Sequence, residues 1–357
     1  MNKILRTMAQ AAGVWAGSSY AAVRIAYNQM FGRSKLLKYS MDYRYADYER
    51  LYPGKYGRRK VQIPDDGYEL TGYIYGEDTG KGLIIVSHGI FAGQECYISI
   101  ILKLVDRGYM VLGFDNTGCC ESPGDGIGGL PQGPLDLMCA LRFVENDPEL
   151  KDMPRFLFGH SWGGYSVTAV LNYVNNVDGV ISISGFDTPT EVTMEMGSSM
   201  LSKAVMITMP MIVLENRRRF GEYANISAVQ GINSCGIPVM VMHGTGDTYV
   251  RYDGSGIINH ADEITNPNVS IVPLDYPGRN GHDDIFLSAE AKEYINELNE
   301  KLEAPKKEYG VKRYWQLPEE VQEEFFRNVD KTVSAQVNMD LVDKIDAFYT
   351  GILNKEL

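Results

Sequence analysis

The sequence predicts an α/β protein built on a mostly parallel, doubly wound sheet, with a helical insertion and extra helices at both ends. Short apolar runs alternate with helix-compatible stretches through the middle of the chain, which is typical of strands joined by crossover helices. This alternation is interrupted once, over residues 186–233. The chain has 357 residues and is 44% hydrophobic, which is enough for one large domain with additions.

The chain opens with a predicted helix over residues 3–31. Its apolar positions include Ile4, Trp15 and Tyr27, but glycine and hydroxyl residues dilute them too far for a membrane span. The basic start from Lys3 to Arg6 keeps an export signal as an alternative to a cytoplasmic protein. We expect this helix to pack on the body of the protein or on a partner chain.

A predicted antiparallel pair over residues 60–76 follows, with a turn at residues 65–67. A helix is predicted from the Gly133-Pro134 pair, where proline suits a first turn, to about Asp147. The apolar runs that predict the remaining strands lie near residues 83–87, 110–114, 155–159, 179–184, 237–242 and 269–274.

The interruption at 186–233 is dense in methionine, a flexible side chain that suits a wall adapting to varied apolar ligands. Ordinary packing of the insertion on the core explains the same residues equally well. The insertion ends in the basic run 217–219, which we interpret as a solvated helix end favoured by the helix dipole. The predicted pocket residues here are Met200, Met206 and Met209, with Phe91 from an earlier loop.

Beyond Leu302 the chain continues for roughly fifty residues. Leu341, Ile345 and Phe348 recur at helical spacing and predict a docked amphipathic helix. With the first helix it could cover the site or form a homodimer interface. The predicted division is an N-terminal helical extension (1–58), a core (59–185 and 234–303), a lid (186–233) and a C-terminal helical extension (304–357).

A Gly-x-Ser-x-Gly motif at residues 159–163 is the most informative feature of the chain. It follows the apolar run 155–158 and precedes a helix-compatible stretch, so Ser161 falls on a sharp strand-to-helix turn. Such a turn projects the serine hydroxyl above the sheet, where it can act as a nucleophile. A chance turn would have no reason to lie between a strand and a helix.

A serine nucleophile needs a base, normally a histidine oriented by a carboxylate. His282 lies in a glycine-rich loop after the run 269–274, where a base carried over the sheet edge is expected. His260 is the alternative, but it falls in a helical stretch. For the acid we favour Asp247, which follows the strand-like run 237–242, over Asp187, which has the character of a turn residue before a proline.

Acyl-transfer chemistry also needs two backbone N–H groups aimed at the developing oxyanion. Trp162 directly follows the serine and should provide one N–H. The loop after the buried run 83–87 begins with a His88-Gly89 pair, and we expect Ile90 to provide the other N–H.

These motifs resemble those of the α/β-hydrolase superfamily, and within it the bacterial esterase, lipase and serine-aminopeptidase-like branch. The resemblance covers roughly residues 60 to 302 and rests on residues 88–90, 159–164, 243–247 and 281–282. Residues 115–122 resemble the turn after the family's next strand, with cysteine and glutamate replacing the usual residues. The resemblance implies an α/β-hydrolase fold and hydrolytic chemistry that needs no cofactor or metal.

Composition limits the partners. The net charge of −12 disfavours nucleic acid and anionic membranes, so no strong membrane association is expected. Five scattered cysteines form neither a disulfide scaffold nor a zinc motif, and the adjacent Cys119 and Cys120 are expected to be an inert buried pair.

The function expected is therefore a serine hydrolase that cleaves carboxylic esters with small to medium apolar acyl groups. A serine aminopeptidase is the first alternative, and it would need an acidic group in the lid to hold a substrate amine. Glu191, Glu195 and Glu215 are the candidates for that group. A hydrolase-fold binding protein without turnover is the second alternative, which an ordered serine, acid and histidine set disfavours.

Overall fold

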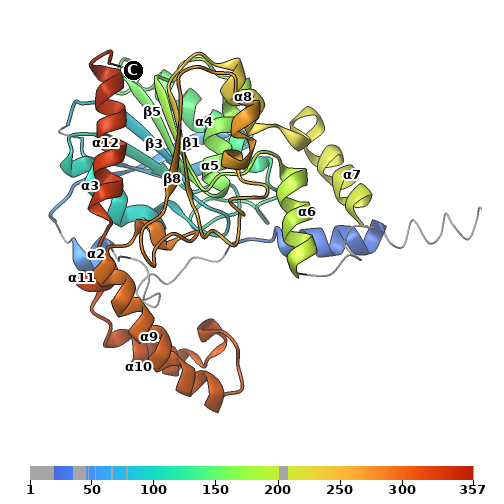
Figure 1. Ribbon diagram of the computed structural model, residues 1–357, viewed down its shortest axis with the longest axis vertical. Coiled ribbons are helices and arrows are strands. Elements are labelled where there is room, and N and C mark those ends of the chain that lie inside the picture. Colours follow the sequence, from blue (N-terminus) through green and yellow to red (C-terminus); the bar gives the residue numbers. More distant parts are fainter. Residues whose placement is uncertain are drawn as a thin grey trace, which may run out of the picture.

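The structure is a computed structural model that describes residues 20–34, 46, 48–52, 54–65, 67–77, 79–200 and 208–356, with the backbone alone for residues 49, 50 and 198–200. The strands are β1 (Arg58–Asp65), β2 (Tyr68–Tyr75), β3 (Leu83–Ser87), β4 (Met110–Phe114), β5 (Arg155–His160), β6 (Gly179–Ile183), β7 (Val239–Gly244) and β8 (Val269–Leu274). The α-helices labelled in Figure 1 are α2 (Tyr48–Leu51), α3 (Ile98–Asp106), α4 (Gln132–Asn146), α5 (Trp162–Ala169), α6 (Pro189–Met200), α7 (Met209–Phe220), α8 (Ala228–Ser234), α9 (Ala289–Glu308), α10 (Glu319–Arg327), α11 (Lys331–Ser334) and α12 (Met339–Leu353).

One eight-stranded sheet forms the centre, in the order β1-β2-β4-β3-β5-β6-β7-β8. β1 and β2 pair antiparallel, β2 pairs antiparallel with β4, and all the later pairings are parallel. The inner strands β3, β4, β5 and β6 are buried along their whole length, as expected for strands covered on both faces. The predicted mostly parallel α/β fold is confirmed.

Helices cover both faces of the sheet. In Figure 1, α4, α5 and α8 lie on one side and α3 and α12 on the other. Two buried clusters correspond to these sides: one contains Leu137, Val167 and Ile232, and the other contains Leu104 and Phe348. Because parallel strands all run in the same direction, their carboxyl ends meet at one edge of this sandwich, and the loops there can bring distant residues together.

The helix predicted at the end of the chain is present as α12. Its apolar positions Leu341, Ile345 and Phe348 are buried within the chain itself, and the hydroxyl of Tyr349 donates a hydrogen bond of 2.7 Å to the carbonyl of Leu157 in β5. α12 is therefore part of the layer that covers the sheet. A homodimer through the terminal helices remains a prediction.

Two helical segments lie beyond the edge of the sheet. α9 and α10 project away from the body in Figure 1 and bury a small apolar cluster of their own that includes Leu298, Leu302 and Phe326. α6 and α7 belong to the predicted lid, whereas α8, which the same range includes, packs in the core cluster through Val229 and Ile232. As a division into domains, the four ranges given by the sequence remain a prediction.

Residues 20–30 are helical, and the rest of the predicted first helix lies outside the described residues. Polar contacts fix this helix to α7: the hydroxyl of Tyr20 donates to Glu215 at 2.6 Å, and Tyr27 donates to Asn216. Arg218 and Arg219 also bind Glu215, so the basic end of α7 serves in part to neutralise a buried carboxylate. In the described part of the chain, every helix is too short or too polar to cross a membrane.

Candidate active site

Ser161 lies at the junction of β5 and α5 in a strained backbone conformation. Its φ is 57° and its ψ is −117°, a region that side-chain-bearing residues rarely adopt and that costs on the order of 1–3 kcal/mol. The flanking glycines make the turn possible, since a Cβ on Gly159 would lie 2.1 Å from the carbonyl oxygen of Gly163. A Cβ on Gly163 would lie 1.9 Å from the carbonyl oxygen of Ser87. The Gly-x-Ser-x-Gly motif therefore forms the sharp turn that the sequence predicts.

The helix after this turn points its N-terminus at the serine. Trp162 is the first residue of α5, and the N–H groups of a first helical turn have no partner within the helix. The Ser161 N–H is itself fixed by the carbonyl of Ile183 in the neighbouring strand, at 2.8 Å. The Trp162 N–H is thus placed beside the serine by the same turn that strains it.

Asp247 and His282 come from the two loops that follow β7 and β8. His282 Nδ1 and Asp247 Oδ2 are 2.7 Å apart, within hydrogen-bond distance. Because a carboxylate accepts, Nδ1 carries the proton, and the second imidazole nitrogen, Nε2, is left as the acceptor. The Asp247 side chain is fully buried and that of His282 is 10% exposed, so this pair is largely shielded from water.

The carboxylate of Asp247 is held on both oxygens. Oδ1 accepts from the backbone N–H groups of Tyr249 at 2.9 Å and Val250 at 3.1 Å. Oδ2 also lies 3.4 Å from Nε2 of His243, a buried histidine at the end of β7, whose Nε2 is 2.9 Å from the carbonyl of Val250. Both neighbours of this Nε2 are acceptors, so it carries a proton. His243 is therefore a second imidazole directed at the same carboxylate.

This arrangement moves the pKa values of the pair apart. Burial alone would raise the pKa of Asp247, but the hydrogen bonds from His243 and His282 outweigh burial and hold the pKa far below its usual range. Burial alone would lower the pKa of His282, but the hydrogen bond and charge of Asp247, with the charge of Asp283, raise it. Asp247 therefore remains ionised, and protonated His282 is stabilised.

The two alternatives from the sequence lie elsewhere. Asp187 accepts hydrogen bonds from the Ser227 hydroxyl at 2.7 Å and from the Val229 N–H at 2.8 Å, so it caps the start of α8. His260 lies between Glu263 at 2.8 Å and Glu191 at 3.2 Å. Neither is hydrogen-bonded to a member of the Asp247–His282 pair.

The loop after β3 lies against the serine. A Cβ on Gly89 would lie 3.6 Å from the Ser161 Cβ. His88 is buried, and burial lowers its pKa to about 4, so it is neutral. Its Nε2 accepts from the Asn116 N–H at 2.9 Å, which puts the proton on Nδ1, 2.7 Å from the Gly89 carbonyl. A trans peptide directs its N–H opposite to its carbonyl, so this bond fixes the direction of the Ile90 N–H.

Among the described residues, Ser161 Oγ makes no hydrogen bond to His282. In free serine enzymes the bond between nucleophile and base is often long and shortens when substrate binds, so the roles of Ser161 and His282 stay predictions here. The structure thus brings Ser161, Asp247, His282, Ile90 and Trp162 to one edge of the sheet, with the acid–histidine bond already formed.

A cavity of about 570 Å³ is lined by His282, by residues of α9 and by the segment that follows α11. Tyr97, His160 and Phe286 form part of its wall, together with Lys292. Neither Phe91 nor Met209 is among its lining residues: Phe91 is 47% exposed and Met209 is buried. The side chains of Met200 and Met206 lie outside the described residues, so the predicted acyl pocket remains a prediction.

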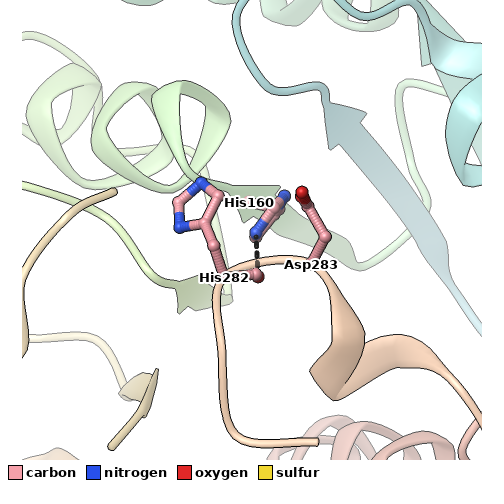
Figure 2. Close-up of side chains that lie close together, drawn as sticks. All are labelled: His160, His282 and Asp283. Atoms are coloured by element: carbon pink, nitrogen blue, oxygen red, sulfur yellow. Dashed lines mark hydrogen bonds between the residues drawn. The ribbon is translucent and has the colours of Figure 1, made fainter. Parts of the chain in front are cut away.

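His160, His282 and Asp283 form a cluster whose ligand-type atoms lie within 4.8 Å of one another (Figure 2). A metal site needs three or four free ligands. Both nitrogens of His160 are engaged, with Tyr97 Oη at 2.8 Å and the His282 carbonyl at 2.9 Å, and His282 Nδ1 is bonded to Asp247. The cluster is therefore arranged for hydrogen bonding more than for metal coordination.

Two contributors to this site were missed at the level of sequence. His243 lies near the end of β7, and Asp247 follows it by four residues in the next loop. This short spacing in the sequence could have indicated that the histidine lies close to the candidate acid. Tyr97 had no such signal, since it is one of 23 tyrosines and meets His160 only through the fold.

Comparison with known proteins agrees with this fold. A family described as "Serine aminopeptidase, S33" matches residues 78–221. An esterase of Pyrococcus furiosus, Pf2001, superposes with a TM-score of 0.52 at 19% identity, covering 72% of this chain and 93% of the esterase. No curated protein matches the sequence at a significant level.

Two more distant solved structures also match. Est1E from Butyrivibrio proteoclasticus, solved with ferulic acid bound, gives a TM-score of 0.45 at 16% identity, covering 68% of this chain and 98% of that chain. The acylaminoacyl peptidase of Pyrococcus horikoshii gives 0.48 at 16% identity, covering 67% and 40%. The chain has the α/β-hydrolase fold, as the motifs in its sequence indicate.

Proposed function

We propose that this α/β-hydrolase is a serine carboxylesterase that acts on esters of small to medium apolar acyl groups. The observation that carries the proposal is the hydrogen bond of 2.7 Å between His282 Nδ1 and Asp247, formed at the same sheet edge as the strained elbow of Ser161. A protein that only binds ligands has no use for an ionised acid fixed on a histidine beside such a serine.

In the proposed reaction, Ser161 Oγ attacks the ester carbonyl and its proton passes to His282 Nε2. The N–H groups of Ile90 and Trp162 stabilise the oxyanion, and Asp247 stabilises the imidazolium. His282 then protonates the leaving alcohol. A water molecule, deprotonated by His282, hydrolyses the acyl-enzyme and restores Ser161. These groups complete the reaction without a metal or cofactor.

The three candidate carboxylates of the insertion already have partners within the protein, which favours an esterase over an aminopeptidase. Glu215 is fully buried and bound by Arg218, Arg219 and Tyr20. Glu195 accepts from the N–H of Ser255 at 2.7 Å, among other bonds to that turn. The third candidate, Glu191, is paired with His260 at 3.2 Å. A substrate amine would have to displace one of these partners.

The test is turnover of p-nitrophenyl esters of graded chain length beside aminoacyl-anilides. We expect hydrolysis of the esters with higher kcat/KM than of any anilide. Higher efficiency on an aminoacyl-anilide would favour the aminopeptidase instead, which the S33 match keeps in view. No turnover of either class would leave a binding protein.

Acyl-chain length should control the efficiency. Each buried methylene contributes about 0.8 kcal/mol, so kcat/KM should rise roughly tenfold for two added carbons until the pocket is full. Alanine at Met200, Met206 or Met209 should then shift or flatten the chain-length profile, while a small fluorophosphonate still labels Ser161. A profile unchanged in all three variants would assign these methionines to plain packing.

The pH profile should follow His282. Its neutral form is the base, and its pKa is raised, so turnover should fall as the pH drops through a value above the ordinary 6.5 or so. The same shift makes the Asp247–His282 pair stabilise the fold below that ordinary value and lose this contribution as the pH rises through the raised pKa.

Asp283→Asn should move this acidic limb to lower pH, because the charge of Asp283 contributes to the raised pKa of His282. Asp152→Asn is the matched control: it removes the same charge from an exposed residue just before the amino end of β5, and should leave the limb in place. A limb that moves equally in both variants would contradict the assignment of His282 as the base.

All five cysteines lie in the described part of the chain and form no disulfide bond there, which agrees with a cytoplasmic location. The location remains part of the proposal.

A further inference from the structure

Three hydrogen bonds connect the loop after β3 to the loop that carries His282, across the turn that carries Ser161. The Gly89 N–H donates to Tyr97 Oη at 3.0 Å, and Tyr97 Oη lies 2.8 Å from His160 Nδ1. His160 Nε2 lies 2.9 Å from the backbone carbonyl of His282, the bond drawn in Figure 2. Two of these residues, Tyr97 and His160, have no part in the proposed reaction.

The chemistry of the groups determines which atom donates in each of these three hydrogen bonds. Tyr97 Oη accepts from Gly89, so its own proton is free to go to His160 Nδ1. A carbonyl can only accept, so His160 Nε2 carries a proton and donates to His282. Burial, with the charge of His282, lowers the pKa of His160 to about 4, which keeps the ring in this neutral form at working pH. One tautomer of His160 therefore satisfies every bond.

The three hydrogen bonds begin and end next to groups of the proposed reaction. Gly89 directly precedes Ile90, the proposed oxyanion donor, and the carbonyl at the other end belongs to the proposed base. Aromatic packing fixes the two side chains in the middle of this row of bonds. The Phe286 ring contacts the His160 and Tyr97 rings edge-on, with distances between ring centroids of 4.9 and 6.1 Å. His160 also lies in β5, the strand that ends at the serine.

We infer that Tyr97 and His160 form a positioning relay that sets the His282 loop and the oxyanion loop at a fixed distance from each other about Ser161. The inference rests on the proposed function. The relay exchanges no proton with substrate. It holds the base and the oxyanion donors in one geometry, where a displacement of about 1 Å can lower the rate up to a hundredfold.

Tyr97→Phe tests the relay, because it removes the hydroxyl that joins two of the bonds and keeps the ring. We expect kcat for a p-nitrophenyl ester to fall at least tenfold, on the order of the loss from a small misplacement, with KM nearly unchanged. Tyr349→Phe is the matched control. It removes a hydroxyl that also bonds a buried partner, at 2.7 Å on the Leu157 carbonyl, and it should keep wild-type kcat. Unchanged kcat in Tyr97→Phe would overturn the relay.

Position 160 provides a second, chemical test. The amide of glutamine can place an N–H where His160 Nε2 lies, whereas leucine fills similar space without a donor. His160→Gln should therefore retain more kcat than His160→Leu, with both folded by circular dichroism. Equal kcat in the two variants would assign His160 to packing alone. If His160→Leu does not fold, His160→Gln is introduced into Tyr97→Phe instead. If the two residues form one relay, the double variant should show no further loss of kcat relative to Tyr97→Phe alone.

The ring nitrogens of His160 give a readout that does not depend on turnover. Nitrogen-15 NMR of the imidazole should show the proton on Nε2 in both proteins, because the His282 carbonyl accepts from it in both. The resonance of the unprotonated Nδ1 should shift in Tyr97→Phe, because this nitrogen loses the hydroxyl that donates to it. The same spectrum in both proteins would contradict the relay. An inactive wild-type enzyme with the expected spectral change would instead contradict the proposed function and leave the relay standing.

Discussion

Replacement of Ser161 by alanine is expected to reduce ester turnover by about a million-fold, the loss typical when a nucleophile is removed from an acid–histidine–serine set. The structure gives the reason: Ser161 is the one residue held in the strained turn between β5 and α5, with the N-terminus of α5 and the Gly89 loop beside it. The variant should fold like the wild type, since the methyl group of alanine fits the same backbone. Steady-state kinetics and a thermal melt check both statements.

Ser166→Ala is the matched control for this substitution. Ser166 is buried in the same helix, but its hydroxyl is bonded at 2.8 Å to the carbonyl of Trp162 within α5. This variant should keep its activity. A fluorophosphonate should label Ser161 in the control and leave the Ser161→Ala protein unlabelled. Substantial turnover by Ser161→Ala, or labelling at another residue, would remove Ser161 from the proposed role.

Asp247→Asn is expected to lower turnover by about four orders of magnitude. The backbone N–H groups of Tyr249 and Val250 bind Oδ1, so they should hold the amide oxygen of asparagine at that position. The NH₂ group would then face His282 Nδ1 and force it to accept. The proton of a neutral His282 would move to Nε2, and this nitrogen must be unprotonated to accept the proton of Ser161. Geometry would be kept and the tautomer would be wrong.

Asp187→Asn is the comparison that separates the two candidate acids. Asp187 caps α8 through Ser227 and Val229, so its loss should cost about 1 kcal/mol of stability and leave turnover close to wild type. Measured side by side, Asp247→Asn should have a lower kcat than the wild type, and Asp187→Asn should have a lower melting temperature. The reverse order of kcat would place the acid after β6.

The sequence by itself carried the fold far, because its signals are local. The strand-like runs, the proline in the first turn of α4 and the glycines around Ser161 each act through a few neighbouring residues, and all are found in the structure. The place of His282 in a glycine-rich loop after the run 269–274 likewise favoured it over His260, because both features can be read from neighbouring residues. The roles given to these residues await the measurements above.

Contacts between distant segments were decided only by the tertiary structure. The two carboxylates 187 and 247 both follow strand-like runs, and only the packing of the loops shows that His282 is bonded to Asp247 while Asp187 caps a helix. The same holds for Tyr97 and His160, which are 63 residues apart and meet at the end of β5.

The apolar pattern of α12 predicted an amphipathic helix but not its partner, because any apolar surface satisfies such a face. The structure buries that face against its own sheet. A local pattern fixes which groups a residue offers. Which groups they meet depends on how the strands are ordered in the sheet, and this order brings loops separated by a hundred residues to one edge.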